Sequence, residues 1–231
     1  MPAVPCSAQH LLTRVLTLVT KRLNNPLTWY FDFISPYAYL QLVAHPDLFA
    51  RDNVVMKPVL FAGLLEHWGH KGPAEIPGKR VHTFRQVAWL AAERGVALKC
   101  PRAHPFNPIH VLRLAIALGA TPPVITTIFD FIWAQGRSVG DEWPALCERL
   151  GVANASALTN DSTVKRTLRE NGDEAIAAGV FGVPTFALNG ELFWGEDSTP
   201  LLRAYLADPS VFATEELRRI THLPAAAERK R

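Results

Sequence analysis

A serine followed by a proline stands where a predicted strand ends and a predicted helix begins. Residues 28–34 are aromatic and β-prone, which is typical of a buried strand, and Ser35-Pro36 follow at once. Serine is a preferred N-cap, and proline is well placed at the first helical position. A hydroxyl at a helix start can also donate a hydrogen bond to a bound thiolate, whose charge the helix dipole favours. Ser35 is therefore either a plain cap or a residue that activates a thiol.

Three residues near the other end of the chain could also take part in ligand binding. Pro184 lies at the start of a second β-prone stretch, and Asp197-Ser198 begin a helical pattern. A carboxylate suits an ammonium group, and the free N–H groups of a helix start suit a carboxylate. Each position also has a plain structural explanation, as a strand start or a helix cap. The histidines do not repeat at ligand spacing, so we predict no metal site.

The strands and helices predicted around these residues form two blocks, one near each end of the chain. Strand, helix and strand are predicted over 28–34, 36–48 and 53–61, with the strands parallel. A β-β-α block follows near the end of the chain, where Asn189-Gly190 is a strong hairpin signal. Helices are expected between the blocks over 79–94, 109–118, 122–135, 144–150 and 162–178. The predicted parts are an N-terminal helical extension (1–25), an α/β domain in two pieces (26–62 and 180–212), an inserted helical subdomain (63–179) and a loose tail (213–231).

Composition narrows the class of protein. The 231 residues are 48% hydrophobic, and 24 Lys+Arg against 21 Asp+Glu leave a net charge of +3. This charge is too small to indicate nucleic acid as a partner, and no apolar run approaches the ~18 residues of a membrane span. Three cysteines without C-x-x-C spacing favour reduced cytoplasm over a disulfide scaffold. The acid-free, basic segment 1–25 leaves two alternatives: an extra helix, which we favour, or an organelle transit peptide.

Two motifs in this element order resemble a known family. The first reads Phe-Asp-Phe-Ile-Ser-Pro-Tyr-Ala-Tyr-Leu over 31–40. The second reads Phe-Gly-Val-Pro-Thr-Phe over 181–186, followed by Phe-Trp-Gly-Glu-Asp over 193–197. Over about 28–207 the chain resembles the 2-hydroxychromene-2-carboxylate isomerases and the related kappa-class glutathione transferases. The resemblance implies a DsbA-like thioredoxin fold with an inserted all-helical subdomain.

The resemblance also implies a site for glutathione as cofactor, with Ser35 as the catalytic residue. It implies a cis bond before Pro184, so that the backbone of Val183 pairs with the cysteinyl part of glutathione as an added strand. His70 stands where relatives often have Asn, and Ser198 where Arg is common, so these two contacts are expected to differ. The glutathione-binding residues implied are Pro36, Tyr37, His70, Val183, Pro184, Asp197 and Ser198.

The implied activity is isomerisation of a small aromatic 2-oxo acid by reversible addition of the glutathione thiolate. Lys71, Arg80 and Asn107 are candidates for contacting this substrate, although Asn107 is better explained as a cap for the helix starting near Ile109. A kappa-like transferase and a non-catalytic binding module remain as alternatives. Ala38 stands where a dithiol would have its second cysteine, which argues against thiol–disulfide exchange. A homodimer is expected from the resemblance alone.

Overall fold

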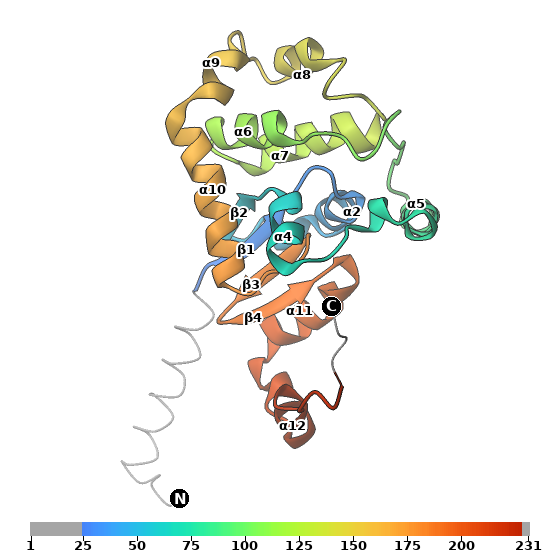
Figure 1. Ribbon diagram of the computed structural model, residues 1–231, viewed down its shortest axis with the longest axis vertical. Helices are drawn as coiled ribbons and strands as arrows, with labels where there is room; N and C mark the ends of the chain where they lie inside the picture. Colours follow the sequence, from blue (N-terminus) through green and yellow to red (C-terminus); the bar gives the residue numbers. More distant parts are fainter. Residues whose placement is uncertain (1–24, 228–231) are drawn as a thin grey trace, which may run out of the picture.

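A four-stranded mixed sheet lies at the centre of the computed structural model, which describes residues 25–227 (Figure 1). The extension predicted over 1–25 lies, apart from Asn25, outside the described residues. The strand order is β2-β1-β3-β4; β1 runs parallel to β2 and antiparallel to β3, and β4 is antiparallel to β3. The strands are β1 (Leu27–Phe31), β2 (Val54–Pro58), β3 (Thr185–Leu188) and β4 (Glu191–Trp194). The predicted β-α-β and β-β-α blocks therefore share one sheet.

The crossover between β1 and β2 contains two helices where the sequence predicted one. Helix α2 (Pro36–Ala44) ends at His45, whose backbone leaves the helical region (φ −131°, ψ 53°). Helix α3 (Pro46–Phe49) then starts with Pro46 in its first turn. The break follows from the proline, because its ring and missing N–H do not allow α2 to continue through it.

The hairpin between β3 and β4 turns at the predicted dipeptide. Asn189 and Gly190 both have positive φ, 55° and 87°, as a type I′ turn requires. The register pairs Phe186 with Phe193 and Leu188 with Glu191. The short turn therefore sets which side chains of β4 face the core.

Helices occupy most of the chain between β2 and β3, as predicted. Helix α10 runs from the outer helical layer down beside the sheet (Figure 1). The helix predicted over 122–135 changes to π-helix after Phe129, and two short helices, α4 and α9, were not predicted. The elements are α4 (Phe61–Trp68), the 3₁₀ turn η1 (Pro73–Glu75), α5 (Pro77–Glu93), α6 (Ile109–Ala117), α7 (Pro122–Phe129), the π-helix η2 (Asp130–Ala134), α8 (Trp143–Arg149), α9 (Ala155–Asn160) and α10 (Ser162–Ala177).

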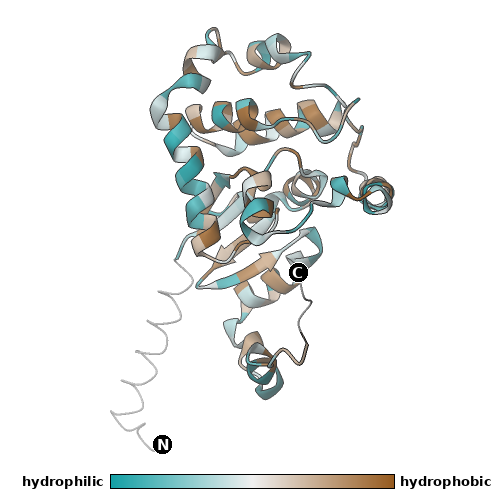
Figure 2. Ribbon diagram, viewed as in Figure 1, coloured by the Kyte–Doolittle hydropathy of each residue, from teal (hydrophilic) through white to brown (hydrophobic). Residues whose placement is uncertain are grey.

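Aromatic packing joins this helical layer to the sheet. Trp29 and Phe31 stack at 4.4 Å on the sheet, and Phe33 packs on Phe129 of α7 at 4.8 Å. All four side chains are fully buried. Figure 2 shows α6 and α7 as largely hydrophobic helices, whereas α10 is mainly hydrophilic along its length. Burial of large aromatic side chains at this junction makes the strand that leads to Ser35 one of the best-packed parts of the molecule.

The C-terminal segment departs from the prediction of a loose tail. After the 3₁₀ turn η3 (Glu196–Ser198), α11 (Thr199–Ala207) packs beside the sheet, and the 3₁₀ turn η4 (Pro209–Phe212) leads to an exposed helix, α12 (Glu215–Thr221). Thr214 caps α12 through a hydrogen bond from Leu217 N–H. Acidic residues in its first turn and basic residues in its last turn complement the helix dipole. These local signals suffice for a helix although the segment has no buried face.

Candidate active site at the start of α2

Ser35 is the N-cap of α2. Its backbone is extended (φ −90°, ψ 113°), and its Oγ accepts a hydrogen bond from the backbone N–H of Ala38 at 3.3 Å. Pro36 follows at the first helical position. Ser35 is only 7% exposed. The capping predicted from these two residues is confirmed.

The loop before β3 lies directly against Ser35. The hydroxyl of Ser35 donates to the carbonyl oxygen of Val183 at 3.5 Å, although 148 residues separate the two in the chain. The Val183–Pro184 peptide bond is cis. The carbonyl oxygen of Pro184 accepts from Gly195 N–H at 2.8 Å, which connects this loop to the end of β4. The fold thus brings the two sequence motifs together at one point.

Three side chains hold the backbone that leads into Ser35. The carboxylate of Asp32 accepts from Ile34 N–H at 3.0 Å, while His104 Nε2 lies 2.9 Å from the carbonyl oxygen of Ile34. Trp133 donates its indole N–H to the carbonyl oxygen of Phe33 at 2.8 Å. His104 and Trp133 both come from the helical insertion. Both polar backbone groups of Ile34 are therefore held by side chains, one from each part of the fold.

The side chain of Asp32 is completely buried, which is uncommon for a carboxyl group. Its second oxygen accepts from Phe61 N–H at 2.9 Å, at the first turn of α4. Burial raises the pKa of this carboxyl to about 7, and the two hydrogen bonds only partly oppose that rise. One carboxylate thus joins the Ser35 loop to α4. The sequence analysis did not select Asp32; the signal was an acidic residue inside an aromatic strand.

The pKa of His104 is also shifted, but it is lowered where that of Asp32 is raised. Burial lowers its pKa, and the positive charge of Arg80 adds to this effect, against the hydrogen bond with Ile34. Because a carbonyl oxygen only accepts, the neutral imidazole must carry its proton on Nε2. Its Nδ1 is buried and has no hydrogen-bond partner within residues 25–227. The rings of Phe84 and Trp133 pack on the imidazole ring of His104, with centroid distances of 5.1 and 5.7 Å.

Asp197 and Ser198 lie in η3, which hydrogen bonds connect to α2. The buried side chain of Gln41 donates to the carbonyl oxygen of Gly195 at 3.2 Å and to Thr199 Oγ1 at 3.0 Å. Asp197 is exposed, and its Oδ1 lies against Gly195, where a Cβ would come within 2.4 Å. Ser198 Oγ donates back to the carbonyl oxygen of Gly195 at 2.9 Å. The hydroxyl of Ser198 thus stabilises the turn rather than capping α11.

Tyr37 connects η3 with α5. Its hydroxyl donates to Gln86 Oε1 at 2.8 Å. Burial raises its pKa, and the negative charges of Asp197 and Glu196 act in the same direction. Asp197 and Tyr37 are therefore close enough to interact electrostatically across the start of α2.

The buried carboxylate of Glu196, next to Asp197, is paired with an arginine and lies near a histidine. It forms a salt bridge with Arg94, the residue after α5, and lies 3.4 Å from His45 Nε2. Glu196 is 4% exposed and Arg94 31% exposed. This pair fastens η3 to the end of α5, and sequence reasoning missed it because the partners are 102 residues apart.

Three predicted site residues lie apart from this cluster. His70 and Lys71 are exposed after the end of α4, and within residues 25–227 their side chains form no hydrogen bond with the start of α2. Asn107 Oδ1 accepts from the N–H of Ile109, the first residue of α6, at 3.0 Å, although the N-cap position itself is occupied by Pro108. The same part of the chain holds no group of three or more His, Cys, Asp or Glu suited to a metal ion, and no helix in it is long and apolar enough to span a membrane.

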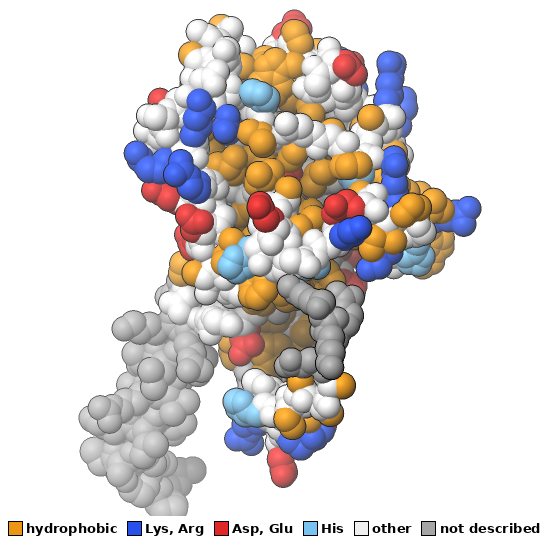
Figure 3. All heavy atoms as spheres, viewed as in Figure 1, with side chains coloured by type: hydrophobic (Ala, Val, Ile, Leu, Met, Phe, Trp, Pro, Cys, Tyr) orange, Lys and Arg blue, Asp and Glu red, His pale blue; other side chains and the backbone are white. Residues whose placement is uncertain are grey.

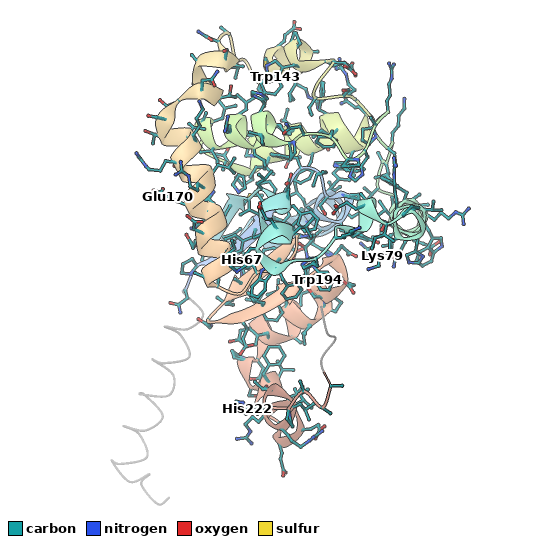
Figure 4. The ribbon with its side chains drawn as sticks, in the orientation of Figure 1. His67, Lys79, Trp143, Glu170, Trp194 and His222 are labelled. Atoms are coloured by element: carbon teal, nitrogen blue, oxygen red, sulfur yellow. The ribbon has the colours of Figure 1, made fainter. Side chains whose placement is uncertain are left out.

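Aromatic side chains border the loop that contains Val183. Trp194 of β4 packs on Phe181 at 5.1 Å, and Trp68 of α4 donates its indole N–H to the carbonyl oxygen of Val180 at 2.9 Å. In the view of Figure 4, Trp194 lies between His67 of α4 and Lys79 of α5. Trp194 is 53% exposed. The candidate site thus has an apolar margin on the side of β4.

Together these features define a protein with a thioredoxin-like fold, in which a capped helix start faces a cis-proline loop and helices are inserted between β2 and β3. The chain belongs to the family described as the DSBA-like thioredoxin domain, whose profile matches residues 27–207. No C-x-x-C motif occurs at the start of α2, where Ser35 and Ala38 stand.

Comparisons with known proteins show which members of this family the chain is similar to. The chain is 28% identical over 197 residues to a 2-hydroxychromene-2-carboxylate isomerase of Sphingobium xenophagum, covering 80% of this chain and all of that protein. It is 25% identical over 206 residues to glutathione S-transferase kappa 2 of Caenorhabditis elegans, covering 78% and 91%. A solved 2-hydroxychromene-2-carboxylate isomerase superimposes with a TM-score of 0.67 at 20% identity, covering 86% and 99% of the two chains. The relatives are thus isomerases and glutathione transferases.

Proposed function

We propose that this protein is a glutathione-dependent cis–trans isomerase of the 2-hydroxychromene-2-carboxylate isomerase type, acting on a conjugated aromatic 2-oxo acid. The observation that carries the proposal is the position of Ser35, a buried hydroxyl at the start of α2 and 3.5 Å from the Val183 carbonyl. The similarity to isomerases over the full length of a relative supports the same reaction. A cytoplasmic location, expected from the sparse cysteines, suits a reaction that needs reduced glutathione.

The residues around Ser35 fit a thiolate. The hydrogen bond from Ser35 Oγ to Val183 is long, so turning the hydroxyl toward a bound sulfur forfeits little. A charge-assisted hydrogen bond contributes ~1.5–3 kcal/mol and the α2 dipole roughly 0.3–1 kcal/mol. Since one pKa unit corresponds to about 1.36 kcal/mol, these interactions together lower the pKa of the thiol by roughly one to three units. That shift is enough to populate the thiolate near neutral pH.

The remaining site residues fit the rest of a γ-glutamyl peptide. The backbone of Val183 is the partner for the cysteinyl backbone, in the manner of an added strand. Asp197, exposed and near Tyr37, suits the α-ammonium group, and Ser198 and Pro36, next to these two residues in the chain, are proposed as further contacts. His70 and Lys71, exposed after α4, are proposed to contact glutathione and the substrate respectively, whereas Asn107 is engaged with the start of α6.

When bound, glutathione supplies a thiolate that adds reversibly to a conjugated carbon, so that the former double bond can rotate before elimination of the thiolate restores it. The role of Ser35 is to hold the sulfur as an anion by donating its hydroxyl proton in a hydrogen bond. The buried backbone before Ser35 keeps that hydroxyl in place. No oxidant or reductant is needed, since the thiolate that adds also leaves.

A kappa-like transferase is the nearest alternative, supported by the similarity to the nematode enzyme. It would use the same activated thiolate but leave the peptide attached to an electrophile. A binding module without activity is the other alternative. Product analysis separates these: recovered thiol with isomerised substrate supports the isomerase, and a stable thioether supports the transferase.

The first test is an ultraviolet titration of the glutathione thiol bound to wild type and to Ser35→Ala. The proposal expects thiolate absorbance about one to three pH units below that of free glutathione; this shift should be lost in Ser35→Ala and kept in Ser156→Ala. Ser156 is an exposed serine on α9 and controls for loss of a hydroxyl. Binding with an unshifted titration, or none at all, would remove the glutathione mechanism.

A further inference from the structure

A cavity of about 510 Å³ lies along the first half of α5, and the proposed function gives it no role, although Arg80 in its lining is a candidate for substrate contact from the sequence. Its volume is in the range of small-molecule sites, which is about 300–1,000 Å³. It is lined by Ala74, Pro77, Arg80, Val81, Phe84 and Arg85. The lining therefore combines two guanidinium groups with an aromatic ring and aliphatic side chains.

The positive charge of this cavity is not neutralised by the protein. Among residues 25–227, neither Arg80 nor Arg85 forms an ion pair. The nearest acidic side chain in sequence, Glu75, accepts a hydrogen bond from Gly72 N–H. Two guanidiniums without acidic partners at a partly apolar cavity suit an anion, and a carboxylate can accept a bidentate hydrogen bond from either.

The start of helix α5 adds to the positive electrostatic potential of the cavity. Helix α5 has 17 residues, no side-chain cap at Ile76 and no acidic residue in its first turn. Its first N–H groups and its dipole are therefore positive and uncompensated by a side chain. Figure 3 shows basic and hydrophobic side chains next to one another at the edge of the molecule, where Lys79 marks the start of α5 in Figure 4.

Two side chains, Phe84 and His104, connect the cavity to the backbone that precedes Ser35. The ring of Phe84 packs edge-on against His104 at 5.1 Å, and His104 lies 2.9 Å from the carbonyl oxygen of Ile34, the residue before Ser35. Two residues further along α5, Gln86 accepts from the hydroxyl of Tyr37 at 2.8 Å. A ligand in this cavity would thus contact Phe84, which packs on the side chain that holds the backbone before Ser35.

We propose that this cavity binds the carboxylate-bearing end of a planar aromatic acid, with Arg80 and Arg85 holding the anion and Phe84 contacting the ring. The inference rests on the proposed function in one respect, since it assigns the residues that select an anionic aromatic substrate. Binding of the anion itself does not require glutathione or Ser35. Two lysines that are close in sequence to lining residues, Lys71 and Lys79, are not themselves part of the lining.

The test is calorimetric titration of the full chain, without glutathione, with 1-naphthoate and with its neutral isostere 1-naphthamide. Wild type is expected to bind naphthoate at least tenfold more tightly than the amide. Arg80→Gln and Arg85→Gln are each expected to weaken naphthoate binding about tenfold and to change amide binding less than twofold. Arg169→Gln, on α10 at the other side of the sheet, is the matched control and is expected to bind like wild type.

Several outcomes overturn the proposal. Equal affinity for naphthoate and the amide, or unchanged naphthoate affinity in the Arg80→Gln, Arg85→Gln double variant, would show that these residues do not hold the anion. Inorganic phosphate bound as tightly as naphthoate would show a general anion site without a role for the ring. Because Ser35→Ala is expected to retain naphthoate binding, failure here and failure of the glutathione mechanism are told apart.

Discussion

The imidazole of His104 and the backbone carbonyl of Ile34 form a hydrogen bond of 2.9 Å across the boundary between the inserted helices and the sheet. Through this bond the insertion holds the residue that precedes Ser35. Asp32 holds the N–H group of the same residue from the opposite side. The candidate catalytic hydroxyl is thus positioned by side chains from both parts of the fold.

Replacement of His104 tests this positioning role. His104→Leu leaves the Ile34 carbonyl without its partner, and the free energy of unfolding is expected to fall by about 1–3 kcal/mol. The thiol titration of bound glutathione is expected to move toward that of the free peptide. His104→Gln, whose amide can replace Nε2 as donor, is expected to recover most of both effects. Equal behaviour of the Leu and Gln variants in urea unfolding and in the titration would contradict the positioning role.

The pH dependence of stability reports on Asp32. Its pKa is about 7 in the folded protein against an ordinary value near 3.8, so between these values the folded state holds a proton that the unfolded state has released. The resulting stability is fully present below about pH 3.8 and is lost as the pH rises through 7. Relative to Asp32→Asn, wild type is expected to lose about 2–3 kcal/mol of unfolding free energy between pH 5 and pH 8.

Urea unfolding of both proteins across this range measures the Asp32 effect. The Asn variant also lacks one acceptor for the N–H groups of Ile34 and Phe61, but that loss does not vary with pH. Asp52→Asn, at an exposed carboxylate before β2, controls for the loss of a negative charge. Parallel curves for wild type and Asp32→Asn would show that Asp32 does not titrate differently on folding.

The salt bridge between Arg94 and Glu196 is expected to contribute more than the surface pairs. Arg94→Met leaves the buried Glu196 carboxylate with only His45 nearby, at an expected cost of about 2 kcal/mol, reduced from a fully buried pair because Arg94 is partly exposed. Adding Glu196→Gln to that variant should recover part of the loss. Arg166→Met, which breaks an exposed pair with Glu170 on α10, should cost less than about 0.5 kcal/mol in the same urea experiment.

Gly182 is predicted to be intolerant of a side chain. A Cβ there would lie 2.5 Å from Nε1 of Trp194, so Gly182→Ala must displace the indole or the loop that carries Val183. We expect a loss of about 1–3 kcal/mol of unfolding free energy and weaker glutathione binding. Gly172→Ala in α10, with open space around it, should instead stabilise the protein by up to about 1 kcal/mol. Unchanged stability and binding in Gly182→Ala would show that Trp194 simply turns away.

Local features of the chain were predictable from the sequence because a few adjacent residues determine them. The Ser35-Pro36 helix start and the Asn189-Gly190 turn depend on hydrogen bonds and φ values within three or four residues. The break at Pro46 and helix α12 rest on equally local signals, which were present in the sequence but were underweighted.

The surroundings of Ser35 could only be decided by the tertiary structure. His104, Trp133 and Glu196 act through partners about 70 to 150 residues away, and no local pattern distinguishes them from ordinary core or surface residues. Their placement follows from the packing of the inserted helices on the sheet, where burial leaves each polar group only a few possible partners. The sequence by itself therefore determined the helix start and its cap, whereas tertiary packing decided which side chains hold that helix start in place.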